Sequence, residues 1–528
     1  MNGTTKSGAS DMSADMSAVE TPGASNDVKS VGPERKATIV IDGCKIEAAC
    51  PASILEAAGR AGISIPTLCH HPALEPYGSC RLCTVQIEKD GRKRFVTACN
   101  YPVEDGLVVN TCSPEVKAIR KMLIELLLAA CPQEPRILDL ASQFGIDRPR
   151  FAQETGECIL CGLCHRVCEE MVGVSAINAQ QRGVSRKVDT PYGELSEECI
   201  GCGACARVCP TSSISKRKNI YPLTAAEISD IEERRLAGKR DAALGVFSRL
   251  FSARSGIEGQ DGGMVTAILC RALETGRIDA AIVAGRDTVL GAAGSVARDR
   301  SAVLDARGTK YVRISVLPAL LKALGEGARK IAVVGTPCQI RVIRKLEKAG
   351  YFQENYPGTE IFAIGLFCFE SFDYSALKEH AFRLWGIDLD SAKKMQIAKG
   401  RFRVRMGEKA GEKEGEKAGE KAREKANGIE YSCRVAELAP DVRAGCSFCD
   451  DLVSRLADIS IGSIGSAQGY STVVVRSERG NMLLEGVQYT AGEANRDEVA
   501  RISAIKKGNA DSSFARLIET SILDQYSS

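Results

Sequence analysis

The cysteines are the residues of this chain whose number and spacing point most directly to chemistry. There are 22 of them among 528 residues, and many lie two residues apart. In a chain of this length, that spacing favours metal ligation over disulfide bridges. Thiolate ligands need a reducing compartment, and the first 36 residues carry acidic side chains such as Asp11 and no apolar core, which is not the pattern of a secretory signal. We therefore expect a metal-binding protein of the cytoplasm.

The strongest pattern is a pair of cysteine runs that share the spacing Cys-x2-Cys-x2-Cys-x3-Cys. This is the spacing of the bacterial two-cluster ferredoxin, in which the fourth cysteine of each run ligates the cluster of the other run. The predicted ligands of one 4Fe-4S cluster are Cys158, Cys161, Cys164 and Cys209. Those of the second 4Fe-4S cluster are Cys199, Cys202, Cys205 and Cys168. Zinc is the alternative metal, and this register of eight thiols disfavours it.

A third group of cysteines precedes these runs, with the spacing Cys-x10-Cys-x2-Cys-x15-Cys. Four thiolates on one loop and a nearby strand can hold a 2Fe-2S cluster, because its two irons need four protein ligands. Gly78, just before the second cysteine, allows the backbone to pass close to the cluster. A zinc site is again the alternative. The predicted 2Fe-2S ligands are Cys69, Cys80, Cys83 and Cys99.

The elements that must position this third group begin with a hairpin and a short helix. Residues 38–41 and 44–47 are predicted strands, and Asp42-Gly43 between them is typical of a type I′ turn. Ser53, with Glu56 three residues later, predicts a capping box at the start of a helix. A hairpin, a helix and then a cysteine-bearing loop form the opening of a β-grasp ferredoxin domain.

The rest of the chain alternates helical and strand-like patterns. Residues 114–130 predict a strongly amphipathic helix. From about residue 247 the pattern becomes α/β, with apolar strand-like runs at 281–284, 331–334, 361–369, 459–461 and 472–475. Five Gly-Glu-Lys-Ala-like units at 407–426 predict a solvated, mobile insertion without chemistry; an electrostatic docking arm is the alternative.

The sequence thus predicts a multidomain protein of class α+β and α/β. Its predicted parts are a disordered tail (1–36), a 2Fe-2S β-grasp ferredoxin domain (37–113), a helical connector (114–150), a bacterial-type two-cluster 4Fe-4S ferredoxin domain (151–218), a helical linker (219–246) and a C-terminal α/β flavin-binding domain (247–528).

Residues 38–130 resemble the N-terminal ferredoxin domain of the large iron–sulfur chain of NADH dehydrogenase (complex I) and of iron-only hydrogenases. The resemblance rests on Ile65-Pro66-Thr67-Leu68-Cys69 and Thr97-Ala98-Cys99. Those families have a further 4Fe-4S motif of one histidine and three cysteines after the long helix; here Cys131 stands alone, and we expect no cluster there. His70 and His71 are expected to make packing or polar contacts. The six remaining thiols outside every site are expected to be buried, namely Cys44, Cys50, Cys112, Cys131, Cys270 and Cys433.

From Gln260 onward the chain resembles the beta-subunit family of coenzyme F-420 hydrogenases and dehydrogenases. The segments that carry the resemblance are 260–266, 274–279, 308–311, 334–339, 365–370, 446–451 and 457–460. The resemblance implies FAD, a third 4Fe-4S cluster and coenzyme F-420 as the hydride-exchanging substrate. Carried over by position, the ligands of the third cluster are Cys338, Cys368, Cys446 and Cys449. At Gly462-Ser463 the family commonly has Gly-Asp, and this chain departs from it.

Gly-rich segments in this half suit a close approach of backbone to a planar cofactor or its pyrophosphate. The candidate FAD-binding residues are Gly262, Gly263, Thr266, Gly308, Thr309, Lys310, Tyr311, Gly335, Thr336 and Pro337. Neither a Rossmann Gly-x-Gly-x-x-Gly motif nor a phosphate-binding P-loop occurs in the sequence, which argues against a conventional NAD(P) site.

Together these patterns predict an iron–sulfur flavoprotein oxidoreductase that exchanges electrons between coenzyme F-420 and one-electron carriers. The alternatives are an electron-transfer subunit of a formate dehydrogenase or hydrogenase-type complex, and a non-catalytic iron–sulfur adaptor. Expected partners are redox subunits of hydrogenase, formate dehydrogenase or respiratory-complex type, or a ferredoxin. The net charge of +3 gives no broad basic field for nucleic acid. Apolar runs are too short for membrane insertion, although peripheral docking is compatible with the sequence.

Overall fold

The computed structural model describes residues 35–196, 198–216, 219–220, 223–287, 291–398, 400–407, 422–425 and 428–519. All but two residues of the predicted N-terminal tail lie outside the described residues, and Arg35 and Lys36 are the exceptions. Lys36 already belongs to the first strand, so this strand begins one residue before the start of the predicted domain.

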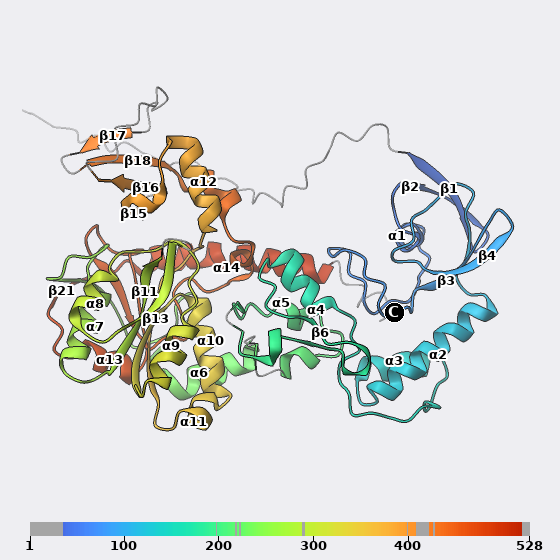
Figure 1. Cartoon of the computed structure of the whole chain (residues 1–528), viewed down its shortest axis with the longest axis horizontal. Helices are drawn as coiled ribbons and strands as arrows, with labels where there is room; N and C mark the ends of the chain where they lie inside the picture. Colours follow the sequence, from blue (N-terminus) through green and yellow to red (C-terminus); the bar gives the residue numbers. More distant parts are fainter. Residues whose placement is uncertain are drawn as a thin grey trace, which may run out of the picture. The chain divides into compact units, whose positions relative to one another are not determined.

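A five-stranded sheet forms the first region, with the strand order β2-β1-β5-β3-β4 (Figure 1). The predicted hairpin is confirmed: β1 and β2 pair antiparallel, and both Asp42 and Gly43 have the positive φ that a type I′ turn requires. The predicted capping box at Ser53 and Glu56 is also confirmed at the start of α1. The bounds are β1 Lys36–Ile41, β2 Cys44–Ala49, α1 Ile54–Arg60, β3 Thr84–Lys89, β4 Arg92–Thr97 and β5 Val108–Asn110.

The predicted amphipathic helix is confirmed as α2, Pro114–Ala130, with Ser113 as its N-cap. Its buried Arg120 donates hydrogen bonds to the carbonyl oxygens of Leu82 (3.1 Å) and Thr84 (2.9 Å), which flank Cys83. The helix therefore supports the loop that carries the first cysteines. α3, Pro135–Gln143, packs against α2.

Short elements surround the two cysteine runs of the next region. Gly162 and Gly203 stand just before the helices α4 (Leu163–Arg166) and α5 (Ala204–Arg207), and both have a positive φ. Left-handed backbone is favourable for glycine, so these two residues let each loop turn sharply into its helix. The other elements here are η1 Val167–Met171, β6 Asn178–Gln180, η2 Gly183–Ser185, β7 Lys187–Asp189, η3 Pro191–Gly193 and η4 Ser213–Lys216.

The predicted helical linker over 219–246 is only partly correct. Helix α6, Ala225–Arg235, begins with a capping box between Thr224 and Glu227. After it, the chain forms a small antiparallel hairpin of β8 (Lys239–Asp241) and β9 (Gly245–Phe247). The charged residues there suggested helix, but Gly245 with its positive φ and the buried Val246 and Phe247 fit a hairpin packed on the C-terminal region.

An eight-stranded mixed sheet is the centre of the C-terminal region, in the order β12-β11-β13-β14-β19-β20-β10-β21 (Figure 1). Strands β11, β13, β14 and β19 run parallel. All five predicted strand runs fall on strands of this sheet, because each is a short apolar segment buried on both faces. The bounds are β10 Arg249–Ser255, β11 Ala280–Asp287, β12 Gly291–Ala297, β13 Lys330–Gly335, β14 Glu360–Leu366, β19 Ile459–Gly462, β20 Ser471–Val475 and β21 Tyr489–Gly492.

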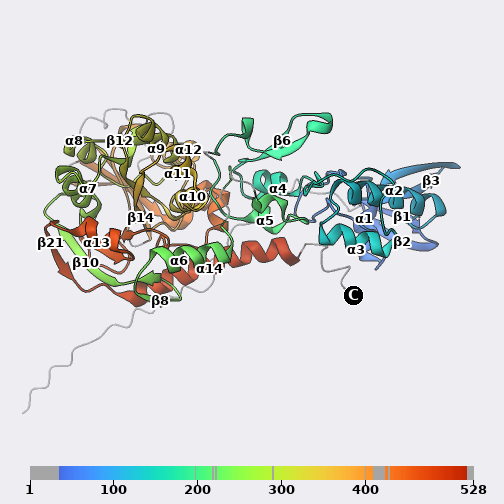
Figure 2. The ribbon, with the colours of Figure 1, turned by 90° about the horizontal axis from the view of Figure 1, so that it is seen from below.

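Helices cover both faces of this sheet, as Figures 1 and 2 show. Helices α7 (Met264–Glu274), α8 (Arg300–Asp305) and α13 (Glu478–Leu484) pack on one face. Helices α9 (Leu317–Gly325), α10 (Pro337–Lys348) and α11 (Tyr351–Asn355) pack on the other. Alternate side chains of β11, such as Ala281 and Ile282, enter these two cores in turn. The result is a three-layer α/β/α arrangement.

A second, four-stranded sheet in the order β15-β16-β18-β17 packs with α12 (Tyr374–Trp385) around a core of its own. The predicted mobile insertion falls here. Residues 408–421 and 426–427 lie outside the described residues, whereas 422–425 form β17 and pair with β18, so this part of the expectation is wrong. The remaining bounds are η5 Leu389–Ser391, β15 Ala392–Ala398, β16 Arg401–Met406, β17 Ala422–Lys425, β18 Gly428–Arg434, η6 Val435–Asp441 and η7 Ala444–Phe448.

The last element is α14, Arg496–Glu519, the longest helix of the described chain. One stripe of this helix is buried, at Val499, Ser503, Lys506, Ala510, Ser513 and Leu517. Among the described helices, none combines the length and the apolar character needed to cross a membrane.

Candidate metal centres

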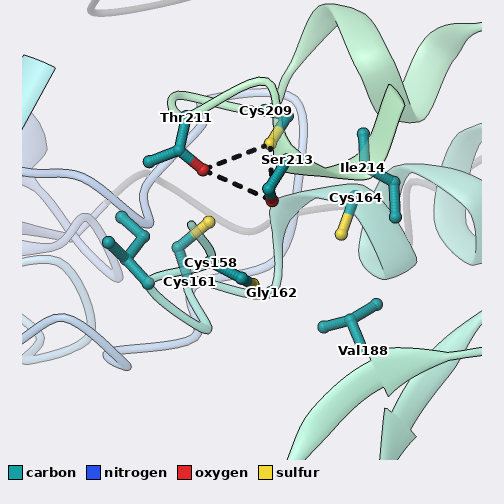
Figure 3. Close-up of a pocket in the computed structure, with 10 residues that line it drawn as sticks. Cys158, Cys161, Gly162, Cys164, Val188, Cys209, Thr211, Ser213 and Ile214 are labelled. Carbon is teal, nitrogen blue, oxygen red and sulfur yellow. Dashed lines mark hydrogen bonds between the residues drawn. The ribbon is translucent and has the colours of Figure 1, made fainter. Parts of the chain in front are cut away.

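The first three cysteines of the first ferredoxin-like run and the last cysteine of the second run line one pocket (Figure 3). Cys209 lies within 3.7 Å of the Thr211 hydroxyl and 3.8 Å of the Ser213 hydroxyl, measured from its sulfur. Hydroxyl contacts of this kind stabilise the charge on a ligating sulfur. The four thiols that line the pocket are those predicted from the spacing, Cys158, Cys161, Cys164 and Cys209.

The other four thiols of the two runs line a second pocket, with Gly201 and Gly203. They are Cys168, Cys199, Cys202 and Cys205. The structure therefore exchanges the fourth cysteine between the runs in the way the spacing predicts. The exchange follows from the paired helices α4 and α5, which bring the end of each run beside the start of the other.

Burial is the largest cause of the raised pKa of five of these thiols, Cys161, Cys164, Cys168, Cys202 and Cys205. It raises the pKa of Cys161 to about 12 and that of Cys202 to about 12. A thiol with so high a pKa stays protonated at neutral pH unless a cation offsets its charge. Two groups of four thiols, each gathered around one pocket, fit iron–sulfur cubanes better than free thiols do.

The third group of cysteines lies on the loop between α1 and β3 and just after β4. The Cys80 amide donates to the Cys69 sulfur at 3.4 Å. The Cys80 side chain lowers the pKa of Cys69 to about 6, and Cys83 lowers the pKa of Cys99 in the same way. The pairs also interact with each other, since Cys69 and Cys80 affect the pKa of Cys99. All four predicted 2Fe-2S ligands are therefore together.

Gly78 of this loop has a left-handed backbone conformation and little space beside it. Gly78 has φ +66°, and a Cβ added to it would lie 3.0 Å from the Asn100 amide nitrogen. Of the two neighbouring histidines, His71 makes polar contacts with the Leu517 carbonyl oxygen at 2.8 Å and with the Ala73 amide at 3.2 Å. The expectation of a polar contact is confirmed for His71.

The four cysteines of the C-terminal region come from three separate segments. Cys338 follows β13 at the start of α10, and Cys368 follows β14. Because β13 and β14 are parallel neighbours, their carboxyl ends meet at one edge of the sheet. Cys446 and Cys449 come from η7 and the residue after it, and both raise the pKa of Cys338 and Cys368. The four predicted ligands of the third cluster are therefore also together.

Polar groups of the chain reach the sulfurs of this third set. The Ser371 amide donates to the Cys446 sulfur at 3.4 Å, and the Thr336 hydroxyl lies 3.2 Å from the Cys338 sulfur. Thr336 was predicted as a cofactor-binding residue. In the structure, it caps α10 together with Gln339 and contacts Cys338.

Sequence reasoning missed one residue of this site, Lys506 on α14. Its ammonium donates to the carbonyl oxygens of Cys368 (2.7 Å) and Phe369. Burial would lower the pKa of Lys506, but the four thiols, led by Cys449, outweigh it and raise the pKa. The available signal was the position of Lys506 on the buried stripe of α14, where an apolar residue is the usual occupant.

The four sites form a continuous series of neighbours. Cys69 of the first loop is close enough to raise the pKa of Cys161, although burial is the larger cause. Cys164 likewise adds to the raised pKa of Cys205. Arg341 of α10 lies between Cys202 and Cys449 and interacts with both.

Two buried arginines lie beside these sites: Arg166 bridges two regions, and Arg341 lies within the C-terminal region. Arg166 donates to the Cys69 carbonyl oxygen at 2.6 Å and to that of Glu75. Arg341 donates to Asp450, the residue after Cys449. Burial opposes the charge of Arg341, but Asp450 and Cys449 outweigh it and raise its pKa.

The candidate FAD residues divide into two groups. A Cβ on Gly262 would lie 2.3 Å from the Ala253 carbonyl oxygen, and one on Gly263 would lie 2.1 Å from that of Ile257. Packing within the chain thus accounts for these two glycines. Gly335, Thr336 and Pro337 form the turn from β13 into α10. Thr266 lies on α7.

The segment 308–311 has a different setting. Gly308 has φ +91°, and a Cβ there would meet nothing within 4 Å. Lys310 donates to the carbonyl oxygens of Ala306 and Arg307. The Tyr311 hydroxyl accepts a hydrogen bond from the Ile397 amide at 2.8 Å, and burial raises the pKa of Tyr311 to about 12. Through this hydrogen bond, the segment contacts β15 of the four-stranded sheet. Thr309 lies within the segment.

The six remaining thiols were expected to be buried, and this expectation is wrong for two of them and only partly met by a third. Cys44 and Cys112 are exposed, and Cys50 is half-buried. Cys44 is the first residue of β2 and is exposed there, although it pairs with the buried Ile41 and lies on the same face as Ile46 and Ala48. Cys131, Cys270 and Cys433 are buried as predicted.

Four family models match the chain. The coenzyme F-420 hydrogenase/dehydrogenase beta-subunit models match at residues 250–322 (N-terminal part) and 328–497 (C-terminal part). A 2Fe-2S iron–sulfur cluster binding domain matches residues 34–114, and a 4Fe-4S dicluster domain matches residues 157–213.

Similar proteins include oxidoreductases and their subunits. The chain is 36% identical over 248 residues to the coenzyme F-420 hydrogenase subunit beta of Methanosarcina barkeri, which is 46% of this chain and 79% of that protein. It is 35% identical over 273 residues to the coenzyme F-420-dependent sulfite reductase of Methanocaldococcus jannaschii, covering 49% of this chain and 40% of that one.

A third relative is the NADPH-Fe(3+) oxidoreductase subunit alpha of Geobacter sulfurreducens, 35% identical over 181 residues, or 30% of this chain and 21% of that one. The chain therefore spans less than half of two of these relatives and most of the third. It belongs to the coenzyme F-420 hydrogenase/dehydrogenase beta-subunit family of oxidoreductases and adds 2Fe-2S and 4Fe-4S cluster domains to it.

Proposed function

We propose that this protein passes electrons between coenzyme F-420 and one-electron carriers. Bound FAD would supply the conversion between hydride and single electrons, and three 4Fe-4S clusters and one 2Fe-2S cluster would carry the single electrons. Packing within the chain already explains candidate glycines such as Gly262 and Gly263, so these residues do not by themselves support FAD binding. The FAD proposal therefore rests on the family and on the F-420-linked relatives.

The observation that carries the proposal is the series of neighbouring thiol sites. Each of the four groups of cysteines interacts electrostatically with the next, directly or through Arg341. A scaffold that used metals only for stability would not need its sites to be adjacent. Electron transfer does need adjacent sites, so this order supports a path from the C-terminal cysteines to the 2Fe-2S loop.

The protein's part in such a path is to hold the sites in place and to exclude water. Arg166 fixes the Cys69 loop against the first ferredoxin-like site, with its guanidinium over the Tyr77 ring at 5.2 Å from the centroid. Arg341 donates to Asp450 beside the C-terminal site and also interacts electrostatically with Cys202 of the second ferredoxin-like site. Each arginine is buried, so its hydrogen bonds are protected from competing water.

Partners are also a proposal. Relatives named as hydrogenase subunits suggest a redox partner of hydrogenase type, while formate dehydrogenase, a respiratory-type complex and a ferredoxin remain the other candidates. The non-catalytic adaptor is the second candidate function. Ser463 stands where the family commonly has aspartate; it is exposed and makes no side-chain hydrogen bond in the described chain. The missing carboxylate favours the adaptor, which would not bind flavin.

The proposal is tested with the full chain purified without air. Iron, sulfide and flavin are quantified first, and the dithionite-reduced protein is then added to oxidised coenzyme F-420. We expect FAD close to one per chain and loss of the visible absorbance of the coenzyme. A protein with iron but no flavin would support the adaptor instead, and a flavin-loaded protein that leaves the absorbance unchanged would contradict the proposed substrate.

A matched pair of variants separates the path from general damage. Cys368→Ser removes a proposed ligand of the C-terminal cluster, whereas Cys270→Ser changes a buried thiol of α7 outside every site. We expect Cys368→Ser to abolish electron passage from the ferredoxin-like clusters to the coenzyme and Cys270→Ser to retain it.

A further inference from the structure

Lys506 is a buried ammonium that lacks a carboxylate partner. Lys506 is only 3% exposed, and its ammonium donates hydrogen bonds to two neutral carbonyl oxygens, those of Cys368 and Phe369. No ion pair joins it to a carboxylate of the described residues, and Glu370 next to these carbonyls is no exception. Burying an unpaired charge is costly, so such a residue is expected only beside a compensating negative charge.

The negative charge that fits is the four-thiol site itself. All four cysteines of the C-terminal site interact electrostatically with Lys506, in the order Cys449, Cys368, Cys446 and Cys338. A cluster held by four thiolates is an anion, and its negative charge grows when it accepts an electron. A fixed cation beside it therefore stabilises the reduced state more than the oxidised state.

The helix delivers Lys506 to this point specifically. Lys506 lies on the buried stripe of α14, between Ser503 and Ala510. The next residue, Lys507, is exposed and forms an ion pair with Asp511 at 2.7 Å. Two adjacent lysines on one helix therefore have opposite settings, one beside the thiols and one in solvent.

We propose that Lys506 is a positioning residue that raises the reduction potential of the 4Fe-4S cluster held by Cys338, Cys368, Cys446 and Cys449. This inference rests on the proposed function, because it needs that cluster to be present. The step concerned is the entry of one electron into the cluster, with no bond made or broken. By raising the potential, the ammonium increases the share of electrons that resides on this cluster at a given solution potential.

The test is a redox titration of the full chain followed by electron paramagnetic resonance. The signal of the C-terminal cluster is first assigned as the one that Cys368→Ser removes. Lys506→Gln is then expected to lower its potential so that, at a fixed solution potential, the ratio of reduced to oxidised cluster falls at least tenfold, which is 59 mV for one electron. Lys507→Gln removes the same formal charge from the same helix and should leave the potential unchanged.

The outcomes separate the two proposals. If the wild-type chain has no signal that Cys368→Ser removes, the proposed function fails, and this inference fails with it. If the signal is present and Lys506→Gln shifts it no more than Lys507→Gln, only the role of Lys506 is overturned.

If Lys506→Gln loses the cluster, as measured by iron content, Lys506→Arg shows whether the loss comes from the missing charge or from altered packing. Retention of both the cluster and its potential in Lys506→Arg would show that the positive charge is what the site requires. Loss of the cluster in Lys506→Arg as well would mean that Lys506 acts through packing, which contradicts the proposal.

Discussion

The ferredoxin-like region and the C-terminal region build four-cysteine sites in opposite ways. In the first, eight thiols come from two short runs, and left-handed glycines such as Gly162 and Gly203 turn the loops around each pocket. In the second, four thiols come from three segments that only the parallel strands β13 and β14 and the turn η7 bring together. The first kind of site depends on local backbone geometry, and the second depends on the completed sheet.

The largest expected effect tests how the cysteines are shared. Cys158→Ser combined with Cys209→Ser should lose about four irons per chain, no more than either single variant, because both residues serve one cluster. Cys158→Ser combined with Cys168→Ser should lose about eight, although both belong to one run. Iron analysis of the purified variants is the measurement. A loss of only about four in the second double variant would mean that each run holds its own cluster.

The next prediction concerns the buried ion pair beside the C-terminal site. Arg341→Met leaves Asp450 with its weaker partner Arg455, so we expect a loss of about 3 kcal/mol in the free energy of unfolding. Arg298→Met breaks a surface pair with Glu326 and should cost less than about 0.5 kcal/mol. Urea unfolding under anaerobic conditions compares them. Equal effects would show that the Arg341 contact is no more than a surface pair.

Local backbone geometry is the subject of a smaller effect. Gly162 has φ +79°, and a Cβ there would lie 2.8 Å from the Tyr77 ring. Gly162→Ala should cost about 1–2 kcal/mol of stability from the left-handed backbone alone. Gly325→Ala, in a helix of the C-terminal region with open space around it, should be neutral or slightly stabilising. The same unfolding assay serves, and a neutral Gly162→Ala would remove the proposed dependence on left-handed glycine.

The smallest effect is expected at the connection between the regions. Lys345 of α10 and Glu227 of α6 form an ion pair at 2.7 Å, with side chains 10% and 22% exposed. A double-mutant cycle of Lys345→Met and Glu227→Gln should give about 0.5 kcal/mol at low salt and less at 1 M salt. A coupling energy that does not respond to salt would indicate a contact other than charge.

Local patterns in the sequence were enough to predict the parts of the molecule that local forces build. The Asp42-Gly43 turn, the Ser53 cap, the helix at 114–130 and the apolar strands all depend on neighbouring residues. The exchange of Cys168 and Cys209 between pockets was predictable because the spacing itself carries it.

Features that depend on distant contacts could not be predicted in this way. Cys338 and Cys368 were assigned by resemblance alone, since nothing near them in the sequence distinguishes a ligand from a core thiol. Lys506 was missed because a lysine on an amphipathic helix usually faces solvent. The hairpin of β8 and β9 was missed because its buried Val246 and Phe247 gain their contacts from residues far along the chain.

Helix α14 makes the relative positions of several sites a matter of helical register. Lys506 contacts the carbonyls beside Cys368, Phe514 packs on Phe448 of η7, and the Leu517 carbonyl contacts His71. At a rise of 1.5 Å per residue, about 16 Å of rigid rod separates the first contact from the last. One inserted residue between them would rotate everything beyond it by about 100°. The number of residues in α14 between these contacts therefore has to be kept for the contacts to form together, just as the spacing of the cysteines has to be kept for each site to form.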